Sequence, residues 1–169
     1  GSAIPWIRVS RTDVTVAPLP NLPTTGMDER RMSAYTPSQL ILDRSQAFSS
    51  GDFGFIFDSY HAESNFRRQF PDRDEYCRYG EENLAPGYNI VDCRILDEDF
   101  NSDESRVVFL MRVDVQGDRQ VFAELAWLKK EGRTWRYHRG QKMTAGELPD
   151  EPESLAIDDF SRLDPMTVF

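Results

Sequence analysis

Two histidines, His61 and His138, are the side chains of this sequence whose ordinary pKa lies near neutral pH. His61 follows Tyr60 in FDSYHAESNFR, after an aromatic-rich run. Its imidazole could be a catalytic base assisted by Tyr60, a metal ligand, or a side chain that bonds the backbone where a short helix ends. No acid stands at a fixed spacing to orient a base, so the structural role is favoured. The two histidines lack any metal-ligand spacing, and no metal site is predicted.

Arg44 is the most informative charged residue, because it interrupts an apolar stripe. It stands four residues after Leu40 and four before Phe48, which places it on the same helix face as both. An arginine there must reach solvent along its stem, contact a ligand anion, or pair with a carboxylate. The ion pair is the favoured interpretation. Its expected partners on the sheet are Glu124, Asp92 or Asp114.

Aromatic residues recur on the last two predicted strands, in WLKKEGRTWRYHRG. Trp127, Trp135 and Tyr137 could stack on a flat ligand. Packing in the core or at a dimer face is the favoured alternative. The candidate catalytic residues are thus His61 and Tyr60, and the candidate ligand-binding residues are Arg44, Tyr60, His61, Trp127 and Tyr137. The sequence has no phosphate-binding loop, nucleophile elbow, zinc-protease motif or dinucleotide fingerprint, and no cofactor is expected.

Three helices are predicted before residue 87. In the first, Thr36 is the N-cap, Pro37 takes the first position, Gln39 completes a capping box and Gly51 ends the helix. The second begins after Asp52 and places Phe53, Ile56, Phe57 and Tyr60 on one face. The third lies within PDRDEYCRYGEENLA, is entered by Pro71 and Asp72, and stops before Pro86.

After Gly87 the pattern of apolar residues changes from helical to alternating. Four strands are predicted, at residues 88–96, 106–115, 119–130 and 134–140, with tight connections at Gly117-Asp118 and at Glu131-Gly132-Arg133. Helices followed by a meander of strands indicate an α+β fold with the helices on one face of an antiparallel sheet. The ordered domain is predicted at 36–140. Residues 1–35 form an extension with an edge strand in WIRVSRTDVTV and a proline-rich connector. Residues 141–169 form an acidic tail, expected to be a solvated arm, although SLAIDDF could dock a short turn.

The acidic composition of the sequence limits the kinds of molecule that the protein is expected to bind. The 169 residues carry a net charge of −9, which disfavours binding to nucleic acid and to anionic membranes. The sequence contains no apolar run of transmembrane length. We expect a soluble protein of the bacterial cytoplasm, with an exported protein that has lost its leader as the alternative. Cys77 and Cys93 match no metal motif and are expected to be free thiols.

The region TPSQLILDRSQAFSSGDFGFIFDSYHAES, followed by WLKKEGRTWRYHRG, resembles the NTF2-like domain of YchJ-like proteins. The matching positions are Pro37, Leu40, Arg44, Ala47, Phe48, Asp52, Phe53, Tyr60, His61, Trp127, Leu128, Gly132, Trp135, Tyr137 and Gly140. The resemblance covers residues 36–140. It implies a cone in which a curved antiparallel sheet wraps the N-terminal helices around a pocket.

Two departures limit what the resemblance implies. YchJ-like proteins flank this domain with cysteine-rich SEC-C motifs, and the two cysteines here form no such cluster, so the zinc of those motifs is not expected. Relatives place an acid on the third strand, and the corresponding alternate positions here are Ala123, Leu125 and Trp127. Glu124 stands one residue along from this set, so its side chain is expected to face away from the pocket.

The leading hypothesis for function is a non-enzymatic domain that binds a small molecule or a protein partner. The alternative is a small acid/base enzyme, an isomerase, dehydratase or hydrolase, that uses a histidine in the pocket. The strand predicted at 106–115 carries large apolar residues on both faces, with Phe109, Met111 and Val113 on one and Val108 and Leu110 on the other, which suggests a homodimer through the sheet. The N-terminal segment or the tail could cover that face instead.

Overall fold

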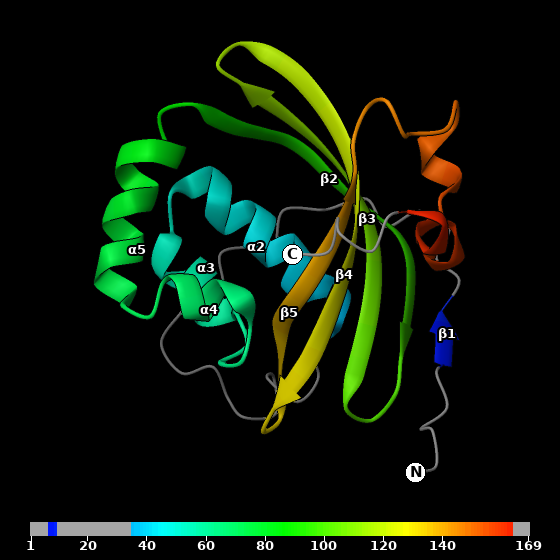
Figure 1. Ribbon diagram of the computed structural model, residues 1–169, viewed down its shortest axis with the longest axis horizontal. Helices are drawn as coiled ribbons and strands as arrows, with labels where there is room; N and C mark the ends of the chain where they lie inside the picture. Colours follow the sequence, from blue (N-terminus) through cyan, green and yellow to red (C-terminus); the bar gives the residue numbers. More distant parts are fainter. Residues whose placement is uncertain (1–6, 10–34, 164–169) are drawn as a thin grey trace.

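The computed structural model describes residues 7–9 and 35–163, and its helices lie on one face of an antiparallel sheet (Figure 1). The sheet has the order β1-β2-β3-β4-β5, so every strand pairs with its neighbours in the chain. Its strands are β1 (Ile7–Val9), β2 (Tyr88–Phe100), β3 (Glu104–Val115), β4 (Asp118–Glu131) and β5 (Thr134–Met143). The expected α+β fold, with helices packed on a meander of four long strands, is confirmed.

Tight turns make this meander possible. Gly117 and Gly132 have φ angles of 89° and 63°, in the left-handed region that suits a residue without a β-carbon. They join β3 to β4 and β4 to β5. Short connections of this kind force adjacent strands to run antiparallel.

The first helix, α2 (Pro37–Ser50), begins and ends as its sequence predicts. The Thr36 side chain accepts a hydrogen bond from the backbone N–H of Gln39 at 3.1 Å, and Gly51 ends the helix with a φ of 77°. The capping box is only half formed, however. The Gln39 side chain donates to Asp43 at 2.9 Å, so it bonds the next turn of its own helix instead of the cap.

Four helical segments lie between α2 and β2, namely α3 (Phe53–Ser59), α4 (Asn65–Gln69), α5 (Arg73–Tyr79) and the π-helical turn η1 (Gly80–Leu84). Asp52 and Asp72 cap α3 and α5 as predicted. The short α4 was not expected, because five residues are too few to show a helical period. None of the described helices has the length and apolar character needed to cross a bilayer.

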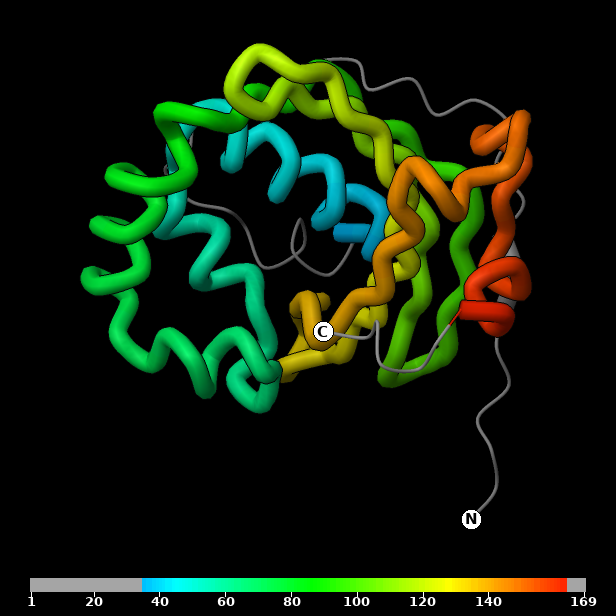
Figure 2. Tube along the Cα trace, turned by 45° about the horizontal axis from the view of Figure 1, so that its top comes forward, coloured from blue at the N-terminus to red at the C-terminus, as the bar shows by residue number. Residues whose placement is uncertain are grey.

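The inner face of the sheet and the helices enclose the main core. Leu40 and Ile41 of α2 pack against Phe109 and Met111 of β3, with Leu128 of β4. Strand β2 has irregular register at Ile90/Asp92 and at Ile95/Asp97. Such bulges bend a strand and increase its twist. The β3–β4 hairpin bends toward α2, as Figure 2 shows, so the sheet curves around the helix.

The outer face of the sheet is covered by the C-terminal segment. This segment contains two short 3-10 helices, η2 (Pro152–Ser154) and η3 (Ile157–Arg162), drawn in orange and red in Figure 1. Its buried residues pack on the outward-facing side chains of β3, β4 and β5; the cluster comprises Val108, Leu110, Ala123, Leu125, Met143, Leu155, Ile157 and Phe160. The Ile157 backbone N–H also donates to the buried carboxylate of Asp97 at 3.0 Å.

The prediction of a solvated arm is therefore wrong for residues 152–162, and the alternative, a docked turn in SLAIDDF, is correct. Acidic residues dominate this segment by count, but its few apolar side chains align on one side and remove an apolar sheet face from water. The strand β5 also extends to Met143, three residues beyond the expected end. The proline-rich connector lies outside the described residues, and the division into three segments stays a prediction.

The covered outer face offers another explanation for the apolar residues that suggested a homodimer. That prediction came from Val108 and Leu110, whose side chains face away from the helices and now lie beneath the chain's own C-terminal segment. One chain thus accounts for the observation. The oligomeric state itself stays a prediction.

Both cysteines are free thiols, as the sequence suggested. Cys77 is partly buried on α5, and Cys93 is buried on β2, where burial raises the pKa of its thiol to about 12. The thiol therefore stays protonated near neutral pH and behaves as a small apolar side chain.

Candidate functional site

A cavity of about 730 Å³ opens between the helices and the concave face of the sheet. Its walls are mainly apolar, and come from α2, α3, β2, β3 and β4: Ile41, Phe48, Ile56, Ile90, Phe109, Met111, Val113, Val115, Val121 and Phe122. Exposed residues surround the mouth; they are Tyr88, Arg119, Gln120, Lys142, Thr144 and Ala145. The volume is within the range of sites for small molecules.

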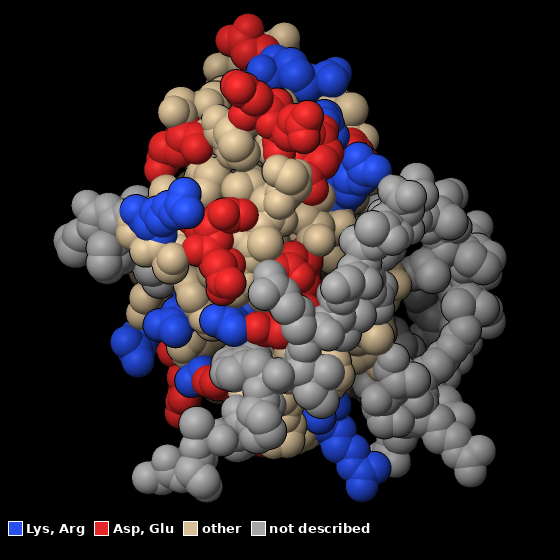
Figure 3. Space-filling view, turned by 90° about the vertical axis from the view of Figure 1, so that its right-hand side faces the viewer, with Lys and Arg blue, Asp and Glu red and all other residues tan. Residues whose placement is uncertain are grey.

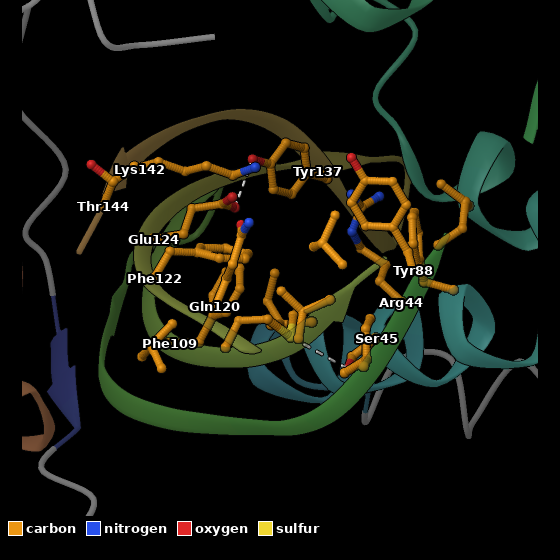
Figure 4. A pocket seen from close by; sticks show the side chains of 18 of the residues that line it. Arg44, Ser45, Tyr88, Phe109, Gln120, Phe122, Glu124, Tyr137, Lys142 and Thr144 are labelled. Carbon is orange, nitrogen blue, oxygen red and sulfur yellow. Dashed lines mark hydrogen bonds between the residues drawn. The ribbon is translucent and has the colours of Figure 1, made fainter. Parts of the chain in front are cut away.

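Arg44 of α2 lines this cavity, as its place in the apolar stripe suggested (Figure 4). Its guanidinium donates a hydrogen bond to the Ser59 hydroxyl. The guanidinium carbon lies 4.5 Å from the centre of the Tyr60 ring and 4.3 Å from that of Tyr137. Burial alone would lower the pKa of Arg44, but the neighbouring tyrosines and Glu124 raise it above its ordinary value. The guanidinium therefore stays charged.

The predicted ion pair of Arg44 is not formed within the described residues. Asp92 bonds Arg112 at 3.0 Å and Asp114 bonds Arg119, because in each case the two residues stand opposite each other on adjacent strands. Those two expected partners were wrong, since the sheet register supplies each aspartate with an arginine of its own. The third, Glu124, forms no salt bridge with Arg44; the two charges interact at longer range, and the Tyr137 side chain contacts both residues.

Glu124 of β4 is the buried carboxylate of the cavity, with 5% of its surface exposed. It accepts a hydrogen bond of 2.8 Å from the Tyr137 hydroxyl. Burial raises the pKa of Glu124, while Lys142, the Tyr137 hydrogen bond and Arg44 act in the opposite direction. The expectation that Glu124 faces away from the pocket is wrong. The side chains of Phe122 and Glu124 point inward, and those of Ala123 and Leu125 point to the outer cluster.

Lys142 enters the cavity because of a bulge in β5. Trp127 pairs with Arg139 and Leu128 pairs with Tyr137, so the register skips His138. The extra residue changes which alternate side chains face inward. Tyr137 points inward before the bulge, and Lys142 does so after it, directly opposite Glu124. A simple alternation from Tyr137 would send Lys142 outward, so its place in the cavity could not be predicted from the sequence.

Tyr60 and Tyr76 complete the polar wall near Arg44. Tyr60 follows α3, and its ring meets that of Tyr137 edge-on at a centroid distance of 5.2 Å. Tyr76, on α5, was not recognised in the sequence, where its surroundings read as an exposed charged helix. Burial raises the pKa of Tyr76 above its usual range, so its hydroxyl remains a hydrogen-bond donor.

His61 lies outside the lining of the cavity. Its backbone N–H donates to the Tyr137 carbonyl at 2.7 Å, and its Nδ1 accepts from the Glu63 backbone N–H at 3.1 Å. The buried ring stands 5.5 Å from that of His138. These contacts match the structural role that the sequence favoured, at a helix end against the sheet. The described residues contain no cluster of three or more His, Cys, Asp or Glu that could hold a metal.

The two tryptophans of the last strands also lie away from the cavity. Trp127 packs with the outer cluster beneath Arg139, whose guanidinium carbon lies 4.6 Å from its ring centre. Trp135 is buried in the inner core. Of the candidate ligand-binding residues, the fold therefore brings Arg44, Tyr60 and Tyr137 together and separates them from His61 and Trp127.

Comparisons with known proteins agree with this architecture. The family model described as YchJ, middle NTF2-like domain, matches residues 36–140. A solved structure of RPA3114, a SEC-C motif containing protein from Rhodopseudomonas palustris, superposes with a TM-score of 0.52 at 23% identity. That match covers 67% of this chain and 83% of the other. A search of curated proteins finds no match.

The family match spans the helices, the cavity wall and most of the sheet, which is well over half of the chain. It covers Arg44, Tyr60, Glu124 and Tyr137 but ends just before Lys142. This chain belongs to the YchJ-like family, and its residues 36–140 form the middle NTF2-like domain of that family.

Proposed function

We propose that this domain binds a small, largely apolar molecule in the cavity between α2 and the sheet. The observation that carries the proposal is an open cavity of about 730 Å³ with apolar walls and a few polar groups at one place. A filled core would leave no room of this size. Concave apolar sites with a few polar side chains are typical of small-molecule binding.

Binding is favoured over acid/base catalysis because of the position of His61. The enzyme hypothesis required this imidazole in the pocket, whereas its Nδ1 is engaged by a backbone N–H and its ring is packed against His138. A protein-interaction role is less favoured for a related reason. The apolar outer face that could have bound a partner is occupied by Leu155, Ile157 and Phe160.

The proposal is tested with N-phenyl-1-naphthylamine, an uncharged probe whose fluorescence increases in apolar surroundings. Two adjacent residues of β2 give a matched pair of variants. Ile90 lines the cavity, whereas Val91 is 45% exposed. Ile90→Trp fills part of the cavity and is expected to weaken probe binding by about tenfold or more, equivalent to about 1.4 kcal/mol. Val91→Trp adds the same side chain outside the cavity and should bind like the wild type.

Circular dichroism and urea midpoints establish that both variants are folded. The proposal is wrong if the wild-type protein does not increase probe fluorescence. It is equally wrong if Ile90→Trp and Val91→Trp bind the probe alike, because the probe would then occupy another surface.

A further inference from the structure

The cavity contains more positive than negative charge. Among its described lining residues the cations are Arg44, Arg119 and Lys142, and the carboxylate is Glu124. Arg119 at the mouth is balanced by Asp114, which it bonds. Among the described lining residues two cations then face one carboxylate, so positive groups outnumber negative ones whether Glu124 is ionised or protonated. This holds in a protein of net charge −9, with acidic side chains prominent on the face shown in Figure 3.

The excess charge belongs to Arg44. Lys142 stands directly opposite Glu124 in the sheet, and its charge lowers the pKa of the Glu124 carboxyl. Arg44 instead contacts neutral groups, namely the Ser59 hydroxyl and the faces of Tyr60 and Tyr137. Ring faces hold a cation in place but do not neutralise it. A guanidinium has five N–H donors in a planar fork, and Ser59 accepts from one of its nitrogens, so donors remain for a further acceptor.

The surroundings of Arg44 also offer hydroxyl donors. Tyr76 lines the cavity in the same neighbourhood, close enough to Arg44 for their charges to interact. Within the described residues the Tyr76 hydroxyl has no hydrogen-bond partner. The contacts of Tyr76 with Phe53 and Phe66 are made by its ring. A cationic fork beside a free phenol is suited to a planar oxyanion, and the adjoining walls of Ile41, Ile56 and Met111 are suited to an apolar body.

We propose that the cavity takes an apolar molecule with a single carboxylate and that Arg44 binds this carboxylate. The inference rests on the proposed function, because it names the chemical class of molecule that the same cavity holds. The apolar part of the molecule would lie against β2 and β3. The carboxylate would complete the hydrogen bonds of the guanidinium.

The test compares three compounds with the same chain, decanoate, decanol and decylamine, each displacing N-phenyl-1-naphthylamine from the wild-type protein. Decanoate is expected to bind about 10- to 100-fold more tightly than decanol, the range for a hydrogen-bonded charge in a partly buried site. Decylamine should bind least well. Equal binding of decanoate and decanol, or a preference for decylamine, would overturn the inference while leaving the proposed function in place. A wild-type protein that binds neither the probe nor any of the three compounds would instead refute the proposed function.

Arg44 itself is tested with two variants. Arg44→Met keeps much of the apolar stem and should bind decanol like the wild type while losing the preference for decanoate. Arg44→Lys retains the charge and should keep part of that preference. If Arg44→Met folds and still prefers decanoate, another group binds the carboxylate and the assignment is wrong. If Arg44→Met does not fold, the comparison of Arg44→Lys with wild type and the three compounds on wild type still decide the matter.

Discussion

Glu124→Gln changes how the stability of this domain depends on pH. The carboxylate is buried, and burial raises its pKa above the ordinary value of 4.5 despite the opposing effects of Lys142, Tyr137 and Arg44. The native protein therefore retains a proton on Glu124 at pH values where the unfolded chain has lost it. Stability from this group is fully present below about pH 4.5 and is lost as the pH rises through the native pKa.

The size of the effect follows from the linkage of protonation and folding. Each pH unit over which native Glu124 holds a proton that the unfolded chain lacks costs the wild type about 1.4 kcal/mol. Glutamine has no such cost, and its carbonyl oxygen can still accept the hydrogen bond from Tyr137. Near pH 4 the variant should be about as stable as the wild type, and it should become the more stable protein as the pH rises through the native pKa of Glu124.

Urea unfolding monitored by tryptophan fluorescence between pH 4 and pH 8 measures this difference. Other groups titrate in the same range, including Asp43, whose pKa burial raises to about 6. Their contributions cancel when the variant is subtracted from the wild type at each pH. Glu104→Gln is the control, because this carboxylate lies on the neighbouring strand with 44% of its side chain exposed. A difference between wild type and Glu124→Gln that is constant with pH, or that falls as pH rises, would refute the reasoning.

Two further predictions concern the outer sheet face and the histidine pair. Phe160 is 1% exposed in the outer cluster, so Phe160→Ala should lower the free energy of unfolding, measured in urea, by at most about 3–5 kcal/mol. Arg162 is exposed on the same short helix, and Arg162→Ala should lower it far less. Equal effects would mean that the segment does not stay docked. Burial, with Lys129, His61 and Arg139, lowers the pKa of His138 from 6.5 to about 4, so wild-type stability should fall as the pH decreases from 6.5 toward 4. In His138→Phe this fall should be reduced, by up to about 2 kcal/mol after allowing for partial exposure, and an unchanged urea profile would contradict it.

The sequence by itself determined the three longer helical regions and the four long strands, and their order, because the signals involved are local. Thr36, Asp52 and Asp72 mark helix starts through side chains that bond the next free N–H groups. The change of period after Gly87 marks the start of the sheet, and Gly117 and Gly132 mark its turns. Arg44 was recognisable as a site residue for the same reason, since a charge in an apolar stripe is visible within one helix.

Only the tertiary structure decided which residues share the cavity. Alternation along β4 separates Glu124 from Ala123 and Leu125, but it does not say which of the two sets faces the helices. The bulge beside His138 then reverses the alternation on β5 and brings Lys142 inward, an effect that depends on pairing with β4. His61 illustrates the same limit, because its backbone bond to Tyr137 joins residues distant in the chain. Contacts between distant segments are set by register and packing, which no local pattern of residues encodes.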